Sequence, residues 1–241
     1  MRRWLKRLAL GCAGLLVLAI VLAISMRWLN PLTSAFMMNA RVSAWSAGDW
    51  SYRTHYQWVD LESISPQAAI AVIASEDQLF PFHAGFDFKS IREAVRNNAR
   101  GRRVHGASTI SQQVAKNLFL WSGGGYFRKG LEAALTLLIE WTWPKERILE
   151  VYLNIAQFGH GIYGVEAAAQ TFYGRPAHRL NREQSATLAA VLPNPERFRV
   201  TAPSSYVLGR RNWILTQMAG LGGVHYLDEL DAAQAAANQK R

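Results

Sequence analysis

The sequence predicts a mainly α-helical protein, with one apolar helix at its N-terminus and a helical domain after it. The first observation is a stretch of nineteen residues without a charge, LALGCAGLLVLAIVLAISM, at residues 8–26. The second is a series of helix-capping residues, each followed by apolar side chains three or four positions apart. The third is that strand signals are few and short, which argues against a sheet-based fold.

Residues 8–26 predict a transmembrane helix, because nineteen residues at the helical rise match the hydrocarbon core of a bilayer. Only Arg27 follows the stretch closely, whereas four basic residues precede it: Arg2, Arg3, Lys6 and Arg7. This bias places residues 1–7 in the cytoplasm as a short tail and the remaining chain across the membrane. A cleaved signal peptide is the alternative, since Ala23 and Ser25 resemble a cleavage site, although the stretch is long for one.

The composition indicates an anionic partner. The formal net charge of +10 suits nucleic acid, a phospholipid surface or a phosphorylated substrate, and composition does not choose among them. Only 18% of the residues are charged, which is low for a soluble protein. The single cysteine, Cys12, excludes an intrachain disulfide. It follows Gly11 as in a lipoprotein cleavage site, but the apolar stretch continues past it, so lipid attachment is not expected.

Residues 27–55 are expected to form a linker, and residues 56–241 a single helical domain. Partial alternation in SYRTHYQWVDLESI, residues 51–64, indicates a short strand where the linker meets the domain.

Capping residues locate the helices of the domain. Ser65 and Pro66 open an apolar helix that ends beside Glu76. Asp87 caps the next helix, and Ser108 or Thr109 caps the third. Apolar periodicity predicts further helices at about 126–141, 145–157, 163–172, 182–192, 204–219 and 227–238.

Glu76 and Asp77 are two acids at the end of an otherwise apolar helix, and LFPFHAG follows them. A carboxylate at the rim of an apolar helix is placed for partial desolvation, which tunes its proton affinity for acid or base chemistry. The alternative is that the two acids merely solvate the helix end.

A second polar group lies in GASTISQQVAKNL, residues 106–118. Gln112, Gln113 and Lys116 share one helical face, with Asn117 beside them, and two amides with an ammonium suit a sugar and a phosphate. The start of this helix exposes backbone donors that favour anions. A capped, solvated helix face is the alternative.

A third group is formed by Arg128, Lys129 and Glu132, whose spacing allows contact on one helical face. As an exposed pair alone it would contribute only a few tenths of a kcal/mol. The aromatic, glycine-rich loop at 121–127 could touch lipid head groups or be a simple surface loop. Tyr152 and Asn154 are expected to satisfy buried polar groups.

Taken together, the polar segments resemble the signature motifs of the family-51 glycosyltransferases, which polymerise peptidoglycan. The resemblance covers roughly residues 56–215. Its five segments, in order, are EDQLFPFHAG from Glu76, GASTISQQVAKN from Gly106, RKGLE from Arg128, KERILEVYLN from Lys145 and RRNWIL from Arg210.

The resemblance implies a lysozyme-like helical glycosyltransferase domain whose second lobe partly dips into the membrane. It implies lipid II, the undecaprenyl-pyrophosphoryl disaccharide-pentapeptide, as the substrate, and β-1,4 glycan strands as the product. It also implies a single-pass protein of the bacterial inner membrane with its catalytic domain in the periplasm. Its partners would be the growing strand and proteins of wall synthesis or division, and no nucleic acid.

By match to the motifs, Glu76 would be the catalytic base and Glu132 a second catalytic carboxylate. Lys116, Arg128 and Lys129 would supply positive charge to the pyrophosphate leaving group. Sugar and phosphate groups would be held by Ser108, Thr109, Gln112, Gln113 and Asn117. A divalent cation, Mg²⁺ or Mn²⁺, assists in some members of the family; no metal ligand is assigned here.

Relatives fused to a transpeptidase carry S-x-x-K and K-T-G motifs, and neither occurs here, so we expect a monofunctional enzyme. Two alternatives stay open at this point. One is a lysozyme-like wall hydrolase, which needs no phosphate-binding cations. The other is a non-catalytic membrane scaffold that keeps the fold.

Overall fold

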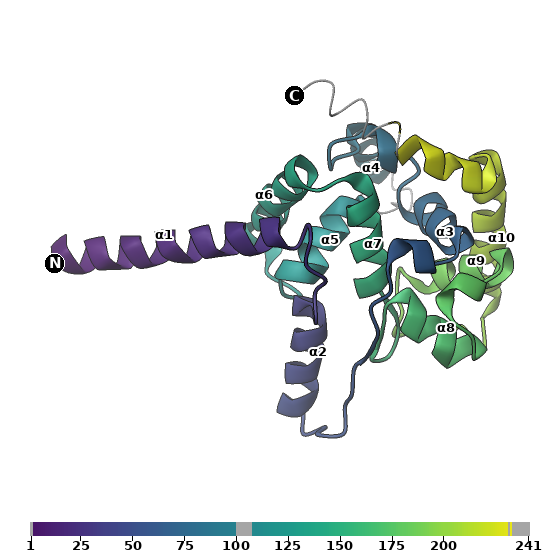
Figure 1. Ribbon diagram of the computed structural model, residues 1–241, viewed down its shortest axis with the longest axis horizontal. Helices are drawn as coiled ribbons and strands as arrows, with labels where there is room; N and C mark the ends of the chain where they lie inside the picture. The colour runs from purple at the N-terminus through teal and green to yellow at the C-terminus, as the bar shows by residue number, and fades with distance from the viewer. Residues whose placement is uncertain (1, 100–107, 231, 233–241) are drawn as a thin grey trace.

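The computed structural model describes residues 2–99, 108–230 and 232. Its first element is α1 (Arg2–Ser25), which covers most of the predicted membrane segment and extends away from the other helices (Figure 1). Counted over the described residues alone, no helix combines the length and the apolar character needed to cross a bilayer.

The segment expected to be a linker contains a second helix, α2 (Ala35–Ser46). Ser34 caps it by accepting a hydrogen bond from the backbone N–H of Met37 at 3.2 Å, and the Met37 side chain is buried in the core. The helix packs against α5 (Ile110–Phe119). The sequence pattern missed it because apolar side chains lie on several of its faces, so no helical period stands out.

The sheet is small, as the scarce strand signals predicted. Strand β3 (Ile162–Tyr163) lies between β1 (His55–Tyr56), to which it is parallel, and β2 (Gln157–Gly159), to which it is antiparallel. The strand expected near the start of the domain is therefore confirmed at β1.

The predicted helices of the domain are confirmed to within a few residues. Ser65 caps α3 by accepting a hydrogen bond from the N–H of Gln67, and Asp87 accepts from the first turn of α4. Thr109, the second of the two candidates, caps α5. The other bounds are α3 (Pro66–Glu76), α4 (Phe88–Ala99), α6 (Gly125–Thr142), α7 (Lys145–Ile155), α8 (Val165–Tyr173), α9 (Arg182–Val191) and α10 (Ser205–Gly220). Most of the helix expected at 227–238, and Gly106 of the second motif, lie outside the described residues.

The helix α3 is the centre of the core. Every side chain from Ala68 to Ala74 is buried, so α3 is covered on all sides. It packs against α9 and α10, while α5 packs against α6 and α7 (Figure 1). The charged end of α3 therefore emerges where two groups of helices meet.

The C-terminal end of α1 is bound to the domain by Arg147 of α7. Its guanidinium donates hydrogen bonds to the carbonyl oxygens of Met26, at 3.0 and 3.1 Å, and Leu29, at 2.7 Å. The indole N–H of Trp143 donates to the carbonyl of Ala23 at 2.9 Å. These donors satisfy carbonyl groups that a helix end leaves without partners. The joint between α1 and the domain is therefore a set of directed hydrogen bonds.

Asn154 satisfies buried polar groups, as predicted. Its amide pairs with both backbone groups of Val59, accepting from the N–H and donating to the carbonyl, each at 2.9 Å. Gly164 lies against the backbone of Asn154 with φ +84°, and a Cβ there would be 2.5 Å from the Asn154 carbonyl oxygen. Gly174 also has a positive φ, +60°, but a Cβ there would meet nothing within 4 Å.

We predict that Gly164→Ala destabilises the protein more than Gly174→Ala does. An alanine in the left-handed region costs about 1–2 kcal/mol, and position 164 adds the clash with the carbonyl of Asn154. Thermal unfolding of the full chain in detergent measures both, with a shift of roughly 2–4 °C for each kcal/mol in a chain of this size. Equal melting temperatures for the two variants would contradict the close approach at Gly164.

Candidate active site

Glu76 lies at the end of α3, where side chains from two further helices contact it. One carboxylate oxygen, Oε1, is 3.3 Å from Nη2 of Arg210, which belongs to α10. The other, Oε2, accepts a hydrogen bond at 3.0 Å from the amide nitrogen of Gln113 of α5. Gln113 is in turn bonded to Tyr152 of α7. The carboxylate is mostly buried, and the contacts that reach it come from hydrogen-bond donors.

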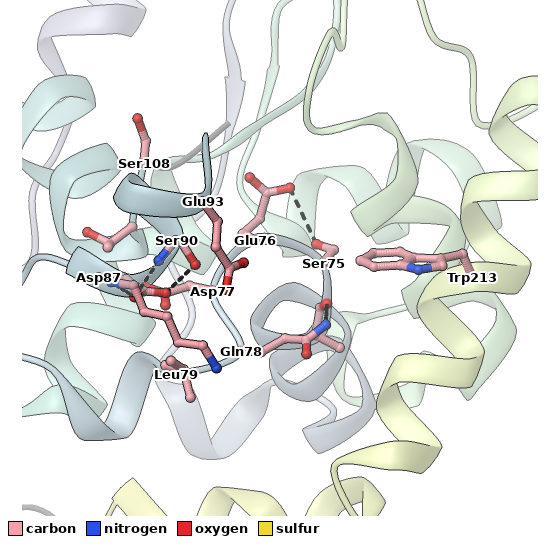
Figure 2. A pocket seen from close by; sticks show the side chains of 13 residues that line it. Ser75, Glu76, Asp77, Gln78, Leu79, Asp87, Ser90, Glu93, Ser108 and Trp213 are labelled. Atoms are coloured by element: carbon pink, nitrogen blue, oxygen red, sulfur yellow. Dashed lines mark hydrogen bonds between the residues drawn. The ribbon is translucent and has the colours of Figure 1, made fainter. Parts of the chain in front are cut away.

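A pocket of about 330 Å³ opens beside Glu76. Figure 2 shows Glu76 between Trp213 on one side and a group of polar side chains, Asp87, Ser90, Glu93 and Ser108, on the other. The indole of Trp213 gives the pocket an amphipathic wall, and this volume is within the range of small-molecule sites. Ser108, predicted to bind substrate, is therefore placed at the pocket.

Asp77 does not solvate the helix end but is buried. Its carboxylate accepts a hydrogen bond from the N–H of Ile110, the first residue of α5, at 3.0 Å. It also contacts Nε2 of His83 at 2.9 Å. Nδ1 of His83 accepts from the N–H of Gly85, so Nε2 is the nitrogen that carries the proton and donates to Asp77. Asp77 thus joins the end of α3 to the start of α5.

Thr109 and Gln112 are used within the protein. The hydroxyl of Thr109 accepts from the N–H of Gln112 and donates to the carbonyl of Gly85 at 2.7 Å. The side chain of Gln112 accepts from the N–H of Thr109, which completes a capping box. Both side chains are buried, and their predicted part in substrate binding stays a prediction.

Lys116 is a partly buried cation without an anionic partner among the described residues. No hydrogen bond or ion pair to its ammonium exists there, and the ammonium lies 5.1 Å from the ring centre of Phe36, which α2 supplies. Burial lowers the pKa of Lys116, while the negative charge of Glu132 opposes this. A buried ammonium in this state favours an anionic ligand. The carbonyl oxygen of the neighbouring Asn117 side chain is also buried without a partner.

The third predicted group is present at the start of α6. Glu132 is 2% exposed and forms ion pairs with Arg128, at 2.8 Å, and with Lys129. The same charges act on the pKa of Lys116, so the three cations surround one region next to α5. Each oxygen of the Glu132 carboxylate is paired with a cation, Oε2 with Arg128 and Oε1 with Lys129. This geometry favours a role for Glu132 in orienting the two cations over contact with a reacting atom.

The sequence did not identify three residues of the site. Arg210 and Trp213 belong to RRNWIL, which the sequence analysis singled out without giving its residues a role. Phe36 had no signal, because it lies in a segment expected to be a linker. Within the described parts of the chain, no group of three or more His, Cys, Asp or Glu side chains could hold a metal ion.

A comparison with known families decides what these features belong to. A family model described as Transglycosylase matches residues 44–219, which include every site residue named above except Phe36. The chain belongs to the transglycosylase family. The match begins inside α2, so most of that helix precedes the region shared with the family.

Curated relatives named as transglycosylases align with this chain over most of their length. A biosynthetic peptidoglycan transglycosylase of Pectobacterium carotovorum subsp. carotovorum (strain PC1) is 51% identical over 226 residues, which is 93% of each chain. One of Escherichia coli O17:K52:H18 (strain UMN026 / ExPEC) is 57% identical over 197 residues, or 81% of each chain. The chain is thus similar to these transglycosylases over most of its length.

We predict that Lys116→Arg moves the alkaline limb of the activity profile to higher pH. Burial lowers the pKa of Lys116 below the ordinary value of 10.5, so rising pH removes its charge early, whereas arginine keeps its proton. Initial rates of transglycosylase activity between pH 7 and pH 10.5 test this. The wild type and Lys116→Arg are compared by the pH at which activity falls to half of its maximum, and not by the maximum itself. Identical limbs would mean that Lys116 is not the titrating group.

Proposed function

We propose that this transglycosylase polymerises lipid II into β-1,4 glycan strands of peptidoglycan, with Glu76 as the catalytic base. The observation that carries the proposal is the Glu76 carboxylate at a pocket, bonded to Gln113 of α5. Lys116 lies about one turn further along the same helix, and its ammonium has no anionic partner among the described residues. The names of the relatives at 51% and 57% identity support the same reaction class and a place in the cell envelope.

In this mechanism Glu76 takes the proton from the 4-hydroxyl of the acceptor sugar as that oxygen attacks the anomeric carbon of the donor. The new C–O bond forms while the bond from the anomeric carbon to the pyrophosphate oxygen breaks, and undecaprenyl pyrophosphate leaves. A single displacement converts the α-linked donor into a β-linked product. Base catalysis by a placed carboxylate typically contributes about 10²–10⁴-fold to the rate.

The pyrophosphate leaves with its negative charge, so the site needs cations more than a proton donor. Lys116 would contact the phosphates directly, because it has no competing anion among the described residues. Arg128 and Lys129 would add charge from α6, in positions that Glu132 sets. Such preorganised charges stabilise the transition state most in sites from which water is excluded.

We further propose that α1 anchors the enzyme in the bacterial inner membrane with the catalytic domain in the periplasm. Large apolar side chains on α1 are exposed along the helix, among them Leu10, Val17, Leu18, Val21 and Leu22. Basic residues precede the apolar stretch, as the orientation requires. The division into residues 1–7, 8–26, 27–55 and 56–241 belongs to this proposal, with α2 as a packed part of the linker segment.

The helix α6 is the part of the domain that we propose to touch the membrane. Tyr126 is 98% exposed, and Phe127 and Trp141 are also well exposed on the same helix. The helix α6 packs against α1 (Figure 1), and Trp141, near the C-terminal end of α6, lines a hollow with Ile24 and Trp28 beside the end of α1. Aromatic side chains of this kind are enriched at membrane interfaces.

We predict that Glu76→Gln abolishes polymerisation while the protein stays folded. Glutamine keeps the size of the side chain and its contact with Arg210, but it cannot accept the proton of the acceptor hydroxyl. The measurement is incubation of detergent-purified protein with labelled lipid II, followed by muramidase digestion of the product. Normal turnover in Glu76→Gln would remove the proposed base, and wild-type protein that binds lipid II yet makes no polymer would favour the scaffold.

We predict that Lys116→Ala weakens use of the donor. Removing the ammonium takes away a direct charge contact to the pyrophosphate, so kcat/KM should fall about 10²-fold or more. Steady-state kinetics with lipid II give this value, and Arg175→Ala, which removes an exposed cation outside the pocket, serves as the charge control. Equal losses in the two variants would point to a general effect of net charge.

A further inference from the structure

Tyr152 is a buried tyrosine that the mechanism above does not use. It comes from α7, is 1% exposed, and its hydroxyl is 3.2 Å from Oε1 of Gln113. The other end of the same amide, Nε2, is the group that donates to Glu76 at 3.0 Å. One amide thus connects a fully buried phenol with the proposed catalytic carboxylate.

The chemistry of these three groups determines their directions. An ionised carboxylate only accepts hydrogen bonds, so Gln113 must turn its NH₂ toward Glu76. Its carbonyl oxygen then faces Tyr152, which must donate. The reversed amide would place a carbonyl oxygen against the carboxylate and repel it. Which way an amide points is assigned from such a network, and here the network has one consistent direction.

We propose that Tyr152 is a positioning residue for the reaction: its hydroxyl orients the Gln113 amide, and this amide fixes the Glu76 carboxylate with its remaining lone pairs toward the pocket. The proposal rests on the proposed function of Glu76 as base, and it adds a group that touches neither substrate nor Glu76. Burial raises the pKa of Tyr152 well above its usual value, which keeps the hydroxyl protonated and able to donate.

The hydrogen bonds among Glu76, Gln113 and Tyr152 can also run in the opposite direction, once Glu76 has taken the proton of the acceptor hydroxyl. A protonated Glu76 can donate to the carbonyl oxygen of Gln113, whose NH₂ then donates to the oxygen of Tyr152, because a phenol both donates and accepts. No proton passes through the amide. Reversal of the amide lets the network pair with Glu76 before and after it takes the acceptor's proton, and only a hydroxyl at position 152 serves both directions.

Charged and titratable groups surround Glu76 from α3, α4, α5, α7 and α10. They are Asp77 at the end of α3, Lys116 of α5, Tyr152 of α7, Arg210 of α10, and Asp87, Lys89 and Glu93 at and before α4. Tyr152→Phe removes one oxygen and changes none of their charges at neutral pH. A change in the titration of Glu76 in this variant therefore reports the hydrogen-bond chain.

The first test is the titration of Glu76 itself, which needs no activity. The full-length protein in detergent is labelled with ¹³C at the glutamate carboxyl, and Glu76→Gln assigns the resonance. In Tyr152→Phe the midpoint should move to higher pH by up to about one unit, since a bond to the charged form is weakened. Tyr163→Phe is the matched control, because Tyr163 is equally buried and its hydroxyl bonds to Tyr52 in a different part of the domain.

The second test is kinetic. Tyr152→Phe should lower kcat about 3- to 10-fold with little change in KM for lipid II and move the acid limb of kcat upward, whereas Tyr163→Phe should leave the limb in place. In a Gln113→Ala background Tyr152→Phe should add nothing further, because the intermediary is gone.

An unmoved midpoint in Tyr152→Phe overturns the proposal. Should this variant not fold, Gln113→Ala alone must move the midpoint the same way, and its failure to do so overturns the proposal as well. A moved midpoint in a protein that makes no polymer would uphold the role of Tyr152 and contradict the proposed function, so the two failures are distinct.

Discussion

The arrangement of the site depends on the buried carboxylate of Asp77. It accepts from the first N–H of α5 and from His83, and so it joins the end of α3, the loop after it and the start of α5. The N-terminus of a helix carries partial positive charge, which stabilises an anion at this position. Since Glu76 precedes Asp77 and Gln113 follows Ile110 by about one helical turn, this contact holds the Glu76 carboxylate close to the Gln113 amide.

A second buried link supports the same loop from the other side. Lys145 donates to the carbonyl of His83 at 2.6 Å and to Glu140 at 2.8 Å, and Ser111 of α5 also donates to Glu140. Burial lowers the pKa of Lys145, and the carboxylate of Glu140 offsets part of that cost. A buried charge left without its partner is strongly destabilising, so these contacts are interdependent. The loop that follows Glu76 is thereby held between α5 and the start of α7.

Much of the fold could be predicted from local chemistry. Ser65 with Pro66, Asp87 and Thr109 mark helix starts because their side chains satisfy backbone N–H groups within a few residues. The carboxylate and the cations of the site were found by motif, and the structure brings Glu76 to Gln113 and Glu132 to Arg128 and Lys129. Contacts between distant segments leave no local pattern, which is why the pairing of Glu76 with Arg210 was not foreseen.

Residues that are neighbours in one sequence motif can have different roles once the chain is folded. Gln112 and Gln113 are neighbours in one motif, yet Gln112 closes the cap of α5 while Gln113 reaches Glu76. The difference arises because position 112 is the third of its helix, where a glutamine can reach back to the cap. Phe36 shows the opposite case: a residue outside the family match lies against the ammonium of Lys116 because α2 packs on α5.

The hydrogen bonds from Arg147 and Trp143 to the end of α1 have a mechanical consequence. With α1 in a bilayer, a joint made of several directed bonds leaves little freedom to bend, so helix and domain tilt as one body. Under the proposed function, a lipid-linked substrate would present its sugars at a set distance from the membrane surface, and this joint would hold the Glu76 carboxylate at one height above that surface. The length and insertion depth of α1 would then set that height.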